Sequence, residues 1–477
     1  MVRTISIEPV TRVEGHLRVE THVENDRITS AKISGLMYRG FEKFLENRHP
    51  VDAARIAQRV CGVCHEVHGV AAVLALEELY KVKSPRNGHI LRDLIMGMHI
   101  VTDHLLHFYT LSLPDYIDFT KILEYKGNDT DINSLKNWVA SSAPQFVLKR
   151  NEGNYVSDVN VCLRMVHNYF RTLKIRSKCG AGMALLGAKV PFSHAVLPGG
   201  VTTDITADRL MQYFHALEEL KNFVVNSYIP DALELASRYP EYFNVGVSYN
   251  NFYANETFTV LGKPVFRGGV VLSGNEQPFS FKEVKEFYDS SFYSSGGQPD
   301  PKKNNAYSWV KSPRYSGEPV EVGPLARMIV NKDQHFQSMM KRLNAKIQSS
   351  VMARHVARAA ECRSLIDHMY LLLDAYKFNE PNINHIDFDK KVSGSGSGFS
   401  IAARGALIHQ IEASNGKITK YNMIVPSTWN FGPSAQGKIG VVEKSLIGTP
   451  VKYSTENSIE AGRVIRSYDP CTACSIH

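Results

Sequence analysis

Two Cys-x-x-Cys pairs near opposite ends of the 477-residue chain constrain its fold more than any other feature. Cys61 and Cys64 form the first pair, and Cys471 and Cys474 form the second. Thiolates three residues apart can face one metal ion, and a glycine inside the first pair lets that turn close. Together the pairs offer four soft sulfur ligands, which suit nickel, iron, zinc or an iron–sulfur cluster. A centre that unites both pairs requires one continuous domain over residues 1–477, although the length alone suggests about three domains.

A structural zinc site is the main alternative that the cysteines leave open. Zinc ribbons usually place their pairs about 15 to 20 residues apart, whereas 406 residues separate Cys64 from Cys471. A redox dithiol needs one pair, not two, and seven cysteines in 477 residues exclude a disulfide scaffold. The other three cysteines match no ligand motif and are interpreted as bystanders, Cys362 as a small hydrophobe on an apolar helix stripe; they are Cys162, Cys179 and Cys362.

The charge and hydropathy of the sequence predict neither a nucleic-acid partner nor a membrane-spanning segment. The net charge is 55 − 47 = +8, spread thinly and without a long basic run, so no nucleic-acid partner is expected. No stretch reaches 18 consecutive apolar residues, and the first residues lack the apolar core of a signal peptide. We therefore expect neither a membrane span nor a signal peptide in this sequence.

The hydrophobic pattern predicts a mainly α protein with minor β structure (α+β), built on a bundle of long helices. Alternating apolar residues predict β structure over residues 1–35, and Gly, Ser, Pro and aromatic residues predict short strands and loops over 240–325. The Gly-Ser run at 393–398 is interpreted as a flexible linker or a tight loop that leads into an interior segment. Helical periodicity predicts four long helices, at about 67–79, 84–114, 204–230 and 332–376, the last being the longest.

Both cysteine pairs stand in longer motifs. The first runs from Arg59 to His68 and the second from Asp469 to His477. In this combination the chain resembles the large, catalytic subunit of nickel–iron hydrogenases, whose patterns are RxCGxCxxxH and DPCxxCxxH. Further matching motifs occur in family order at Arg12-Val13-Glu14-Gly15-His16, Arg39-Gly40-Phe41-Glu42, Asp103 to Tyr109, Arg404 to Leu407 and Val425 to Asn430. The resemblance implies the large-subunit fold and reversible oxidation of H2 to protons and electrons.

The resemblance also implies a nickel–iron centre held by the four cysteines. Cys61 and Cys471 would be terminal nickel ligands. Cys64 and Cys474 would bridge nickel to an iron that carries CO and cyanide. Thiolates donate strongly to soft redox metals and can accept a proton.

Several polar residues match positions around that centre. Glu14 matches the glutamate that takes a proton from a terminal cysteine, although a lone strand glutamate is usually only solvated. Arg404 matches an arginine above the metals, and Asp103 and Asp469 match carboxylates beside it; for Asp103 a helix-surface acid is the alternative. Ser427, which follows Pro426, matches a hydroxyl that donates to cyanide, with a plain turn serine as its alternative.

A second metal and a supporting histidine complete the implied site. Glu42, His477 and the backbone carbonyl of Met423 match ligands of a magnesium ion, which prefers hard donors. His68 would hydrogen-bond a bridging sulfur, and a satisfied core histidine is the alternative. The chain departs from the family pattern Glu-Ala-Pro-Arg-Gly beside Arg404, because Ile401 and Ala403 replace the acid and the proline.

The three remaining cysteines cannot hold an electron-transfer chain, so an iron–sulfur small subunit is the expected partner. The motif around Asp103 looks most like the respiratory, H2-uptake branch. That branch implies membrane association through a cytochrome b or another quinone-linked subunit, and export together with the small subunit; a cytoplasmic location stays open. A regulatory H2-sensing relative of the same family is the second alternative.

Overall fold

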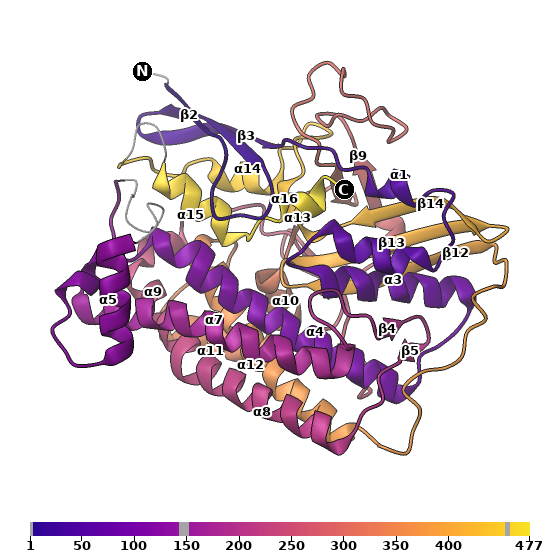
Figure 1. Cartoon of the computed structure of the whole chain (residues 1–477). Helices are drawn as coiled ribbons and strands as arrows, with labels where there is room; N and C mark the ends of the chain where they lie inside the picture. Colours follow the sequence, from indigo (N-terminus) through magenta and orange to yellow (C-terminus); the bar gives the residue numbers. More distant parts are fainter. Residues whose placement is uncertain (1–2, 143–151, 454–457) are drawn as a thin grey trace.

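The computed structural model describes residues 3–142, 152–453 and 458–477 (Figure 1). It has a mixed α/β fold, which confirms the predicted class. Its main helices are α1 (Phe41–Leu45), α2 (Asp52–Ala57), α3 (His65–Tyr80), α4 (Arg86–Leu106), α5 (Thr130–Ser142), α7 (Val159–Gly187), α8 (Ala207–Phe223), α9 (Ile229–Arg238), α10 (Pro324–Asn331), α11 (Gln334–Arg342), α12 (Val351–Ala375), α13 (Pro426–Phe431), α14 (Val441–Leu446), α15 (Ile459–Ser467) and α16 (Thr472–Ser475).

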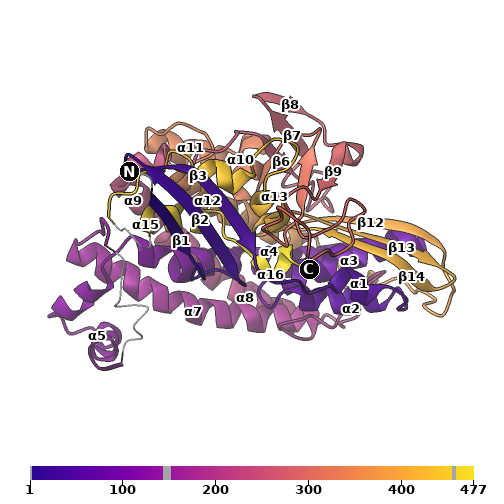
Figure 2. The same ribbon diagram turned by 90° about the horizontal axis from the view of Figure 1, so that it is seen from above.

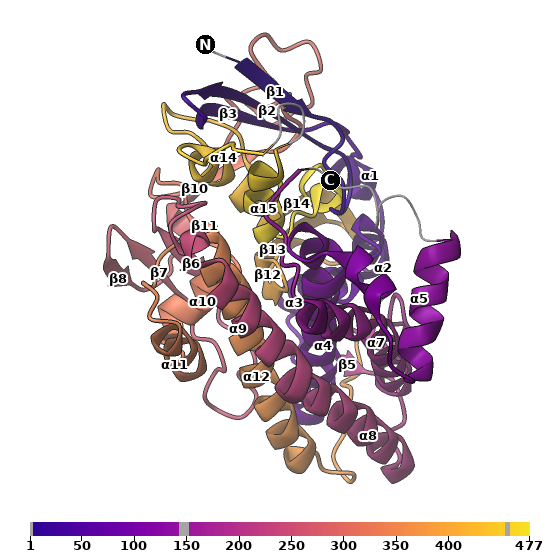
Figure 3. The ribbon, with the colours of Figure 1, turned by 90° about the vertical axis from the view of Figure 1, so that its left-hand side faces the viewer.

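The N-terminal segment is an antiparallel sheet in the order β1 (Arg3–Ile7), β2 (Leu17–Glu24) and β3 (Arg27–Gly35), as predicted. Leu17, Val19 and Val23 point into the core, because alternate residues of a strand face the same side. In Figures 1 and 3 the sheet lies at one end of the molecule, and the C-terminal helices α14 and α15 lie between it and the long helices.

Four long helices, α4, α7, α8 and α12, pack side by side (Figure 1). Glycines bring them close: a Cβ at Gly97 of α4 would lie 2.9 Å from the sulfur of Met369 on α12. The Tyr213 hydroxyl of α8 donates to the Leu94 carbonyl of α4 at 2.7 Å. The predicted bundle is therefore present, although α7 is a member that the sequence analysis did not predict.

The boundaries of two predicted helices were wrong. The segment 332–376 is not one helix: α11 ends at Arg342, and α12 begins at Val351 after a loop. Asn344 adopts a left-handed conformation (φ 49°), which an α-helix cannot continue through. The helix predicted over 204–230 instead passes through a π-helical turn at Val224–Tyr228 and continues to Arg238. Pro230 does not end it, because the proline lies in the first turn of α9, where its missing N–H costs little.

The Gly-Ser run was also misassigned, because it is a strand and neither a linker nor a loop. β12 (Gly394–Ala402), β13 (Gly405–Ser414) and β14 (Lys417–Ile424) form an antiparallel sheet that extends beside α3 (Figure 2). A Cβ at Gly396 or Gly398 would lie 2.1 or 1.9 Å from a carbonyl oxygen of α3. Glycine is needed there because the strand presses directly on the helix backbone.

The region 240–325 contains short strands and loops, as predicted. Its strands are β6 (Phe252–Ala254), β7 (Gly269–Leu272), β8 (Asn275–Gln277), β9 (Val284–Phe287), β10 (Ser312–Tyr315) and β11 (Glu321–Val322), while β4 (Val196–Leu197) and β5 (Gly200–Val201) form a separate small pair. Within the described residues, no helix is both long and apolar enough to cross a membrane.

A buried ion pair ties this region to α12 and to the C-terminal segment. Arg354 donates to both carboxylate oxygens of Glu321 at 2.8 and 3.1 Å, to Ser467 at 3.2 Å and also to the Tyr468 hydroxyl. Arg354 and Glu321 are both buried. The pair therefore connects the helix bundle with the chain segment just before the second cysteine pair.

We expect Glu321→Gln to lower stability by about 3–5 kcal/mol, because it leaves the Arg354 charge buried and uncompensated. The matched control is Glu219→Gln, which removes the partner of Lys178 in an exposed pair at 2.6 Å and should cost less than about 1 kcal/mol. Thermal unfolding midpoints of the two variants measure the difference. Equal midpoints would show that the buried pair has no special role.

Candidate metal centre

The four cysteines of the two pairs meet in the interior, as the sequence predicts. Their sulfurs all lie within 4.8 Å of one another, and all four residues are buried. The Sγ–Sγ distance is 3.4 Å between Cys61 and Cys471 and 3.1 Å between Cys64 and Cys474. Cys64 immediately precedes α3 and Cys471 immediately precedes α16, so each pair is held at the start of a helix.

The N-terminal segment holds the second pair in place through its backbone. The Glu14 amide donates to the Pro470 carbonyl at 3.2 Å, and the Thr472 amide donates to the Glu14 carbonyl at 2.7 Å. Gly15 permits this approach: its φ is +85°, and a Cβ there would lie 2.5 Å from the Ala473 nitrogen. The close approach of the two segments therefore explains why the Arg-Val-Glu-Gly-His motif has a glycine at this position.

Arg39 joins the two cysteine segments. Its guanidinium donates to the Val60 carbonyl, just before the first pair, and to the Ala473 carbonyl within the second pair at 3.0 Å. Its backbone amide donates to the Ile476 carbonyl at 3.0 Å. One side chain therefore sets the spacing between segments that lie about 400 residues apart in the sequence.

The buried cluster cannot hold four thiolates without bound positive charge. Hydrogen bonds from the other three thiols hold the pKa of Cys61 well below its ordinary value. Burial raises the pKa of Cys471 and of Cys474. A single thiolate is therefore the favoured state of the bare cluster, whereas four thiolates require bound positive charge.

Arg404 lies beside this cluster, held by two carboxylates. Its Nη2 is 3.0 Å from Asp469 Oδ1, and its Nη1 is 3.7 Å from Asp103 Oδ2. Burial would lower the pKa of Arg404, but Asp469, Cys471 and Asp103 outweigh it, so the guanidinium stays charged. Its Nε and Nη1 have no hydrogen-bond partner among the described residues. Two buried donors are thus left for an anionic or polar group at the centre.

Asp103 is buried and is not a helix-surface acid. Besides Arg404, its carboxylate faces His99 Nε2 at 3.6 Å and Arg176 Nη2 of α7 at 3.6 Å. Burial raises the pKa of Asp103 to about 6, while Arg404 and Arg176 oppose the rise. Sequence reasoning missed Arg176, because no motif surrounds it and α7 was not predicted.

The departures from the family pattern beside Arg404 are accommodated by packing and by a second ion pair. Ile401 is fully buried and pairs with Ala406 across the hairpin that β12 and β13 form. The Ala403 carbonyl accepts a hydrogen bond from Arg327 at 3.4 Å. Arg327 in turn donates to both oxygens of Glu361 at 2.7 and 2.9 Å, so the turn that carries Arg404 is braced from α12.

Glu14 is partly buried next to the cluster. Burial and the negative charge of Cys61 raise the pKa of Glu14, whereas Arg404 and Arg39 lower it. A carboxyl group whose pKa is raised above its ordinary value accepts a proton more readily. Its neighbour across the backbone bridge is Cys471, one of the predicted terminal ligands.

Ser427 and His68 both lie against the cysteine segments. The Ser427 hydroxyl, one residue after Pro426 at the start of α13, accepts the Cys471 amide at 2.9 Å, which leaves its own O–H free to donate. The side chain of His68 is hydrogen-bonded through its Nδ1 to His409 Nε2 at 3.1 Å. Among the described residues, no hydrogen bond joins His68 to a cysteine sulfur. Sequence reasoning missed His409, five residues after Arg404.

The predicted magnesium ligands also converge, together with a lysine that the sequence analysis missed. His477 Nε2 lies 3.2 Å from Glu42 Oε1, and the Met423 amide donates to the same oxygen at 2.9 Å. Lys311 donates to both Glu42 oxygens at 2.9 and 2.8 Å. Burial opposes ionisation, but Lys311 and His477 outweigh it and lower the pKa of Glu42 to about 2. The carbonyl role of Met423 stays a prediction.

The three other cysteines lie outside the centre. All three are buried. Burial raises the pKa of Cys179 to about 12, so its thiol stays protonated and unreactive at neutral pH. Burial also raises the pKa of Cys362 well above its ordinary value, in agreement with its interpretation as a small hydrophobe.

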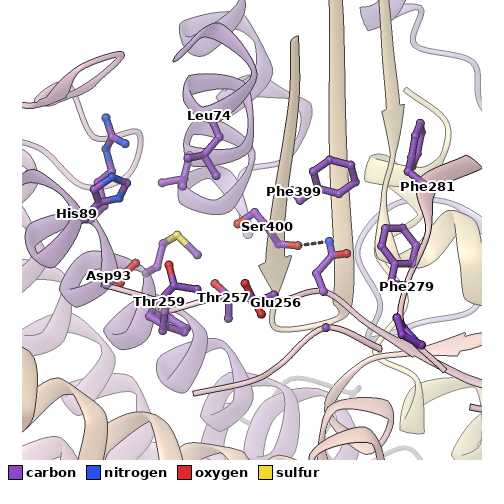
Figure 4. Close-up of a pocket in the computed structure, with 17 residues that line it drawn as sticks. Leu74, His89, Asp93, Glu256, Thr257, Thr259, Phe279, Phe281, Phe399 and Ser400 are labelled. Atoms are coloured by element: carbon purple, nitrogen blue, oxygen red, sulfur yellow. Dashed lines mark hydrogen bonds between the residues drawn. The ribbon is translucent and has the colours of Figure 1, made fainter. Parts of the chain in front are cut away.

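A cavity of about 690 Å³ lies away from the cysteines (Figure 4). Phe279, Phe281 and Phe399 form one wall, while His89 and Asp93 face them from α4. Burial raises the pKa of Asp93 to about 8. None of the predicted site residues lines this cavity, so the candidate chemistry lies in the buried cluster and not here.

The donor set fits a soft redox-metal centre. Four sulfurs converge, a buried guanidinium beside them has unpaired N–H groups, and a half-buried carboxyl lies at the edge. Fold and site together define a protein with a buried redox-metal centre.

Comparison with known proteins identifies that class. A family model described as "Nickel-dependent hydrogenase" matches residues 39–477, and one described as "HoxL-like" matches residues 4–33. The chain is 34% identical to the periplasmic NiFeSe hydrogenase large subunit of Desulfomicrobium baculatum, over 99% of this chain and 94% of that protein. It is 28% identical to the quinone-reactive Ni/Fe-hydrogenase large chain of Wolinella succinogenes, over 100% and 96% of the two chains.

The fold agrees with solved structures of such enzymes. The Ni-Fe-Se hydrogenase from D. vulgaris Hildenborough in the reduced state matches with a TM-score of 0.89 and 34% identity, over 100% of both chains. The chain therefore belongs to the nickel-dependent hydrogenase family, as a catalytic large subunit that oxidises H2.

Proposed function

We propose that this chain takes up H2 for respiration and passes the electrons to an iron–sulfur small subunit. The observation that carries the proposal is the buried cluster of four sulfurs beside the half-paired Arg404. The test is H2 oxidation with an artificial one-electron acceptor, measured on the chain purified with its partner. Acceptor reduction that depends on H2 supports the proposal, and a nickel-containing complex that reduces no acceptor would contradict it.

In this proposal all four cysteines hold the metals. Cys61, Cys64, Cys471 and Cys474 would all be ligands of a nickel–iron centre whose iron would carry CO and cyanide. The Sγ atoms of Cys64 and Cys474 lie 3.1 Å apart and those of Cys471 and Cys474 lie 2.6 Å apart, which supports one centre shared by both pairs. When bound, the centre supplies the redox-active site at which H2 is polarised and split.

The protein's own groups around the centre orient ligands and exclude water. The free N–H groups of Arg404 and the free O–H of Ser427 are donors suited to cyanide nitrogens. Asp469 and Asp103 keep the guanidinium in position and keep it charged. Because these groups are buried and fixed by packing, they need no rearrangement during the reaction.

Glu14 is proposed to move the proton. After H2 is split, a proton held on the Cys471 sulfur transfers to the Glu14 carboxylate, which then releases it outward. The raised pKa of Glu14 supports this role, because a carboxylate with a raised pKa accepts a proton more readily. The backbone bridge places the Glu14 and Cys471 segments side by side.

A magnesium ion is proposed at Glu42, His477 and the Met423 carbonyl. Two buried atoms without hydrogen-bond partners among the described residues, His477 Nε2 and Glu286 Oε1, support a cation there. Lys311 already supplies one positive charge to Glu42. Oxygen and nitrogen donors suit the hard ion.

Glu42→Gln is expected to release the magnesium, because the amide removes the only charged oxygen ligand in the proposed set. Metal analysis of the purified complex measures this, with nickel determined in the same sample. Glu46→Gln, which alters an acid paired with Lys43 at 2.8 Å, is the control and should retain the ion. Equal magnesium in both variants would place the ion elsewhere.

We infer the partners of this chain from its similarity to other hydrogenase large subunits. The matched relatives are named as large subunits or large chains, which supports a small subunit as partner. A relative named quinone-reactive supports a membrane cytochrome b or another quinone-linked subunit, and a relative named periplasmic supports export with the small subunit. Co-purification from membranes tests this association.

A further inference from the structure

The cavity shown in Figure 4 has an aromatic wall whose rings hold one another in place. The ring centroids of Phe279 and Phe281 lie 6.1 and 5.6 Å from that of Phe399, and both pairs meet edge to face. The buried Tyr253, which does not line the cavity, stacks on Phe279 at 4.5 Å. The wall is therefore a pre-formed aromatic surface of the kind that binds flat apolar groups and cations.

The opposite wall carries a carboxyl group that has no partner. Asp93 is partly buried and faces the phenylalanines from α4. Among the described residues, its carboxyl oxygens make no hydrogen bond and no ion pair, and the neighbouring Arg92 is the one charged group that acts on it. A carboxylate that is largely removed from water without a counter-charge is costly, so a cation bound in the cavity would stabilise it.

Arg92 cannot act as that counter-charge, because its guanidinium is already occupied. Its Nη1 and Nη2 donate to the two Glu77 oxygens at 3.1 and 2.7 Å, and Nη2 also donates to the Leu197 carbonyl at 2.6 Å. Arg92 and Glu77 are both buried and balance each other's charge. The second acid of the lining is Glu256, which is exposed and makes no ion pair among the described residues. The lining of the cavity therefore presents two unpaired acids and no unpaired arginine or lysine.

We propose that this cavity is a binding site for an organic cation with a flat aromatic body, whose N–H groups donate to Asp93 while its ring packs against the three phenylalanines. The cavity volume of about 690 Å³ lies within the range of small-molecule sites, about 300–1,000 Å³. The ligand supplies the counter-charge that the α4 wall lacks, and aromatic rings attract cations. An anion of the same shape would meet two acids and no unpaired base. The inference goes beyond the proposed function, since no residue of the metal centre lines the cavity.

Binding of the cation is expected to release a proton from Asp93. Burial raises the pKa of Asp93 to about 8, and Arg92 opposes the rise. A bound cation stabilises the carboxylate, so the affinity should increase as the pH rises from 7 to 9. The other ionisable groups of the lining are His89, Arg92 and Glu256. Burial and Arg92 lower the pKa of His89, so its imidazole stays neutral across this range, and Arg92 stays paired with Glu77.

The test measures the binding of two probes to the complete complex by titration calorimetry. Naphthylmethylguanidinium is the cation and stays charged at every pH used, and naphthylmethylurea is the neutral molecule of nearly the same shape. Asp93→Asn removes the acid of the α4 wall, Phe281→Ala removes one ring, and Glu256→Gln removes the other acid. Asp374→Asn alters an exposed aspartate of α12 outside the cavity and is the matched control.

The wild type should bind the guanidinium probe at least about tenfold more tightly than the urea probe, with an affinity that rises up to about tenfold from pH 7 to pH 9. Asp93→Asn should remove both the preference for the cation and the pH dependence, and it should leave the affinity for the urea probe unchanged. Phe281→Ala should weaken the binding of both probes. Glu256→Gln should keep the pH dependence, and Asp374→Asn should bind both probes like the wild type.

Equal affinities of the wild type for the two probes would overturn the proposal, as would undetectable binding at millimolar probe. Unchanged binding of the guanidinium probe in Asp93→Asn or in Phe281→Ala would also overturn it. Asp93→Asn replaces an unpaired acid by an amide of the same shape, so the decisive comparison needs only a mild substitution. Because the assay measures binding and not turnover, its result is independent of whether the complex oxidises H2.

Discussion

Cys471→Ser is expected to yield protein without nickel and without H2 oxidation. A serine hydroxyl is a hard and very weakly acidic donor, and it cannot replace a thiolate on a soft redox metal. The loss should be complete and not partial, because the four sulfurs lie within 4.8 Å of one another and act as one ligand set. Nickel analysis and an H2-dependent dye-reduction assay on the same preparation measure the two losses.

The matched control is Cys179→Ser, which changes an equally buried cysteine on α7 outside the centre. That variant should bind nickel normally and keep its activity, with at most a loss of stability from burying a hydroxyl. Full nickel occupancy in Cys471→Ser would show that Cys471 is not a ligand.

Glu14→Gln is expected to lower H2 turnover by about 100- to 10,000-fold while nickel and the infrared bands stay those of the wild type. Glutamine has nearly the same shape and keeps the backbone bridge to Cys471, but it cannot accept the proton. Glu14→Gln should therefore lose turnover but keep its nickel, whereas Cys471→Ser should lose both.

Glu20→Gln is the control for Glu14→Gln, since Glu20 lies on β2 away from the cysteines and has no proposed role. Its turnover should equal that of the wild type. Normal turnover in Glu14→Gln would show that protons leave the centre by another route.

The metal centre was predictable from the sequence because its residues stand in short local motifs. Each cysteine pair has its own spacing, and Arg39, Glu14 and Asp469 stand in short motifs beside or ahead of a pair. The structure explains these motifs through backbone contacts: Gly15 allows the approach to Ala473, and Arg39 bonds both cysteine segments. Short sequence motifs mark such positions because the backbone and side-chain geometry there accepts only a few residue types.

What the sequence did not predict depends on contacts between distant segments. Gly396 and Gly398 resemble a linker until α3 is known to press on them, at which point glycine becomes a requirement of strand packing. Lys311 and His409 belong to no sequence motif. They contribute to the site only because the fold places Lys311 against Glu42 and His409 against His68. The break between α11 and α12 is a third case, since an apolar stripe continues across residues that tertiary packing holds in a loop.

The most direct measurement is an infrared spectrum of the wild-type complex combined with quantification of its nickel, iron and zinc. The four-sulfur cluster beside Arg404 predicts nickel in the purified protein, together with CO and cyanide bands that are lost in Cys471→Ser. Zinc without nickel, and a spectrum without these bands, would contradict the assignment of the centre.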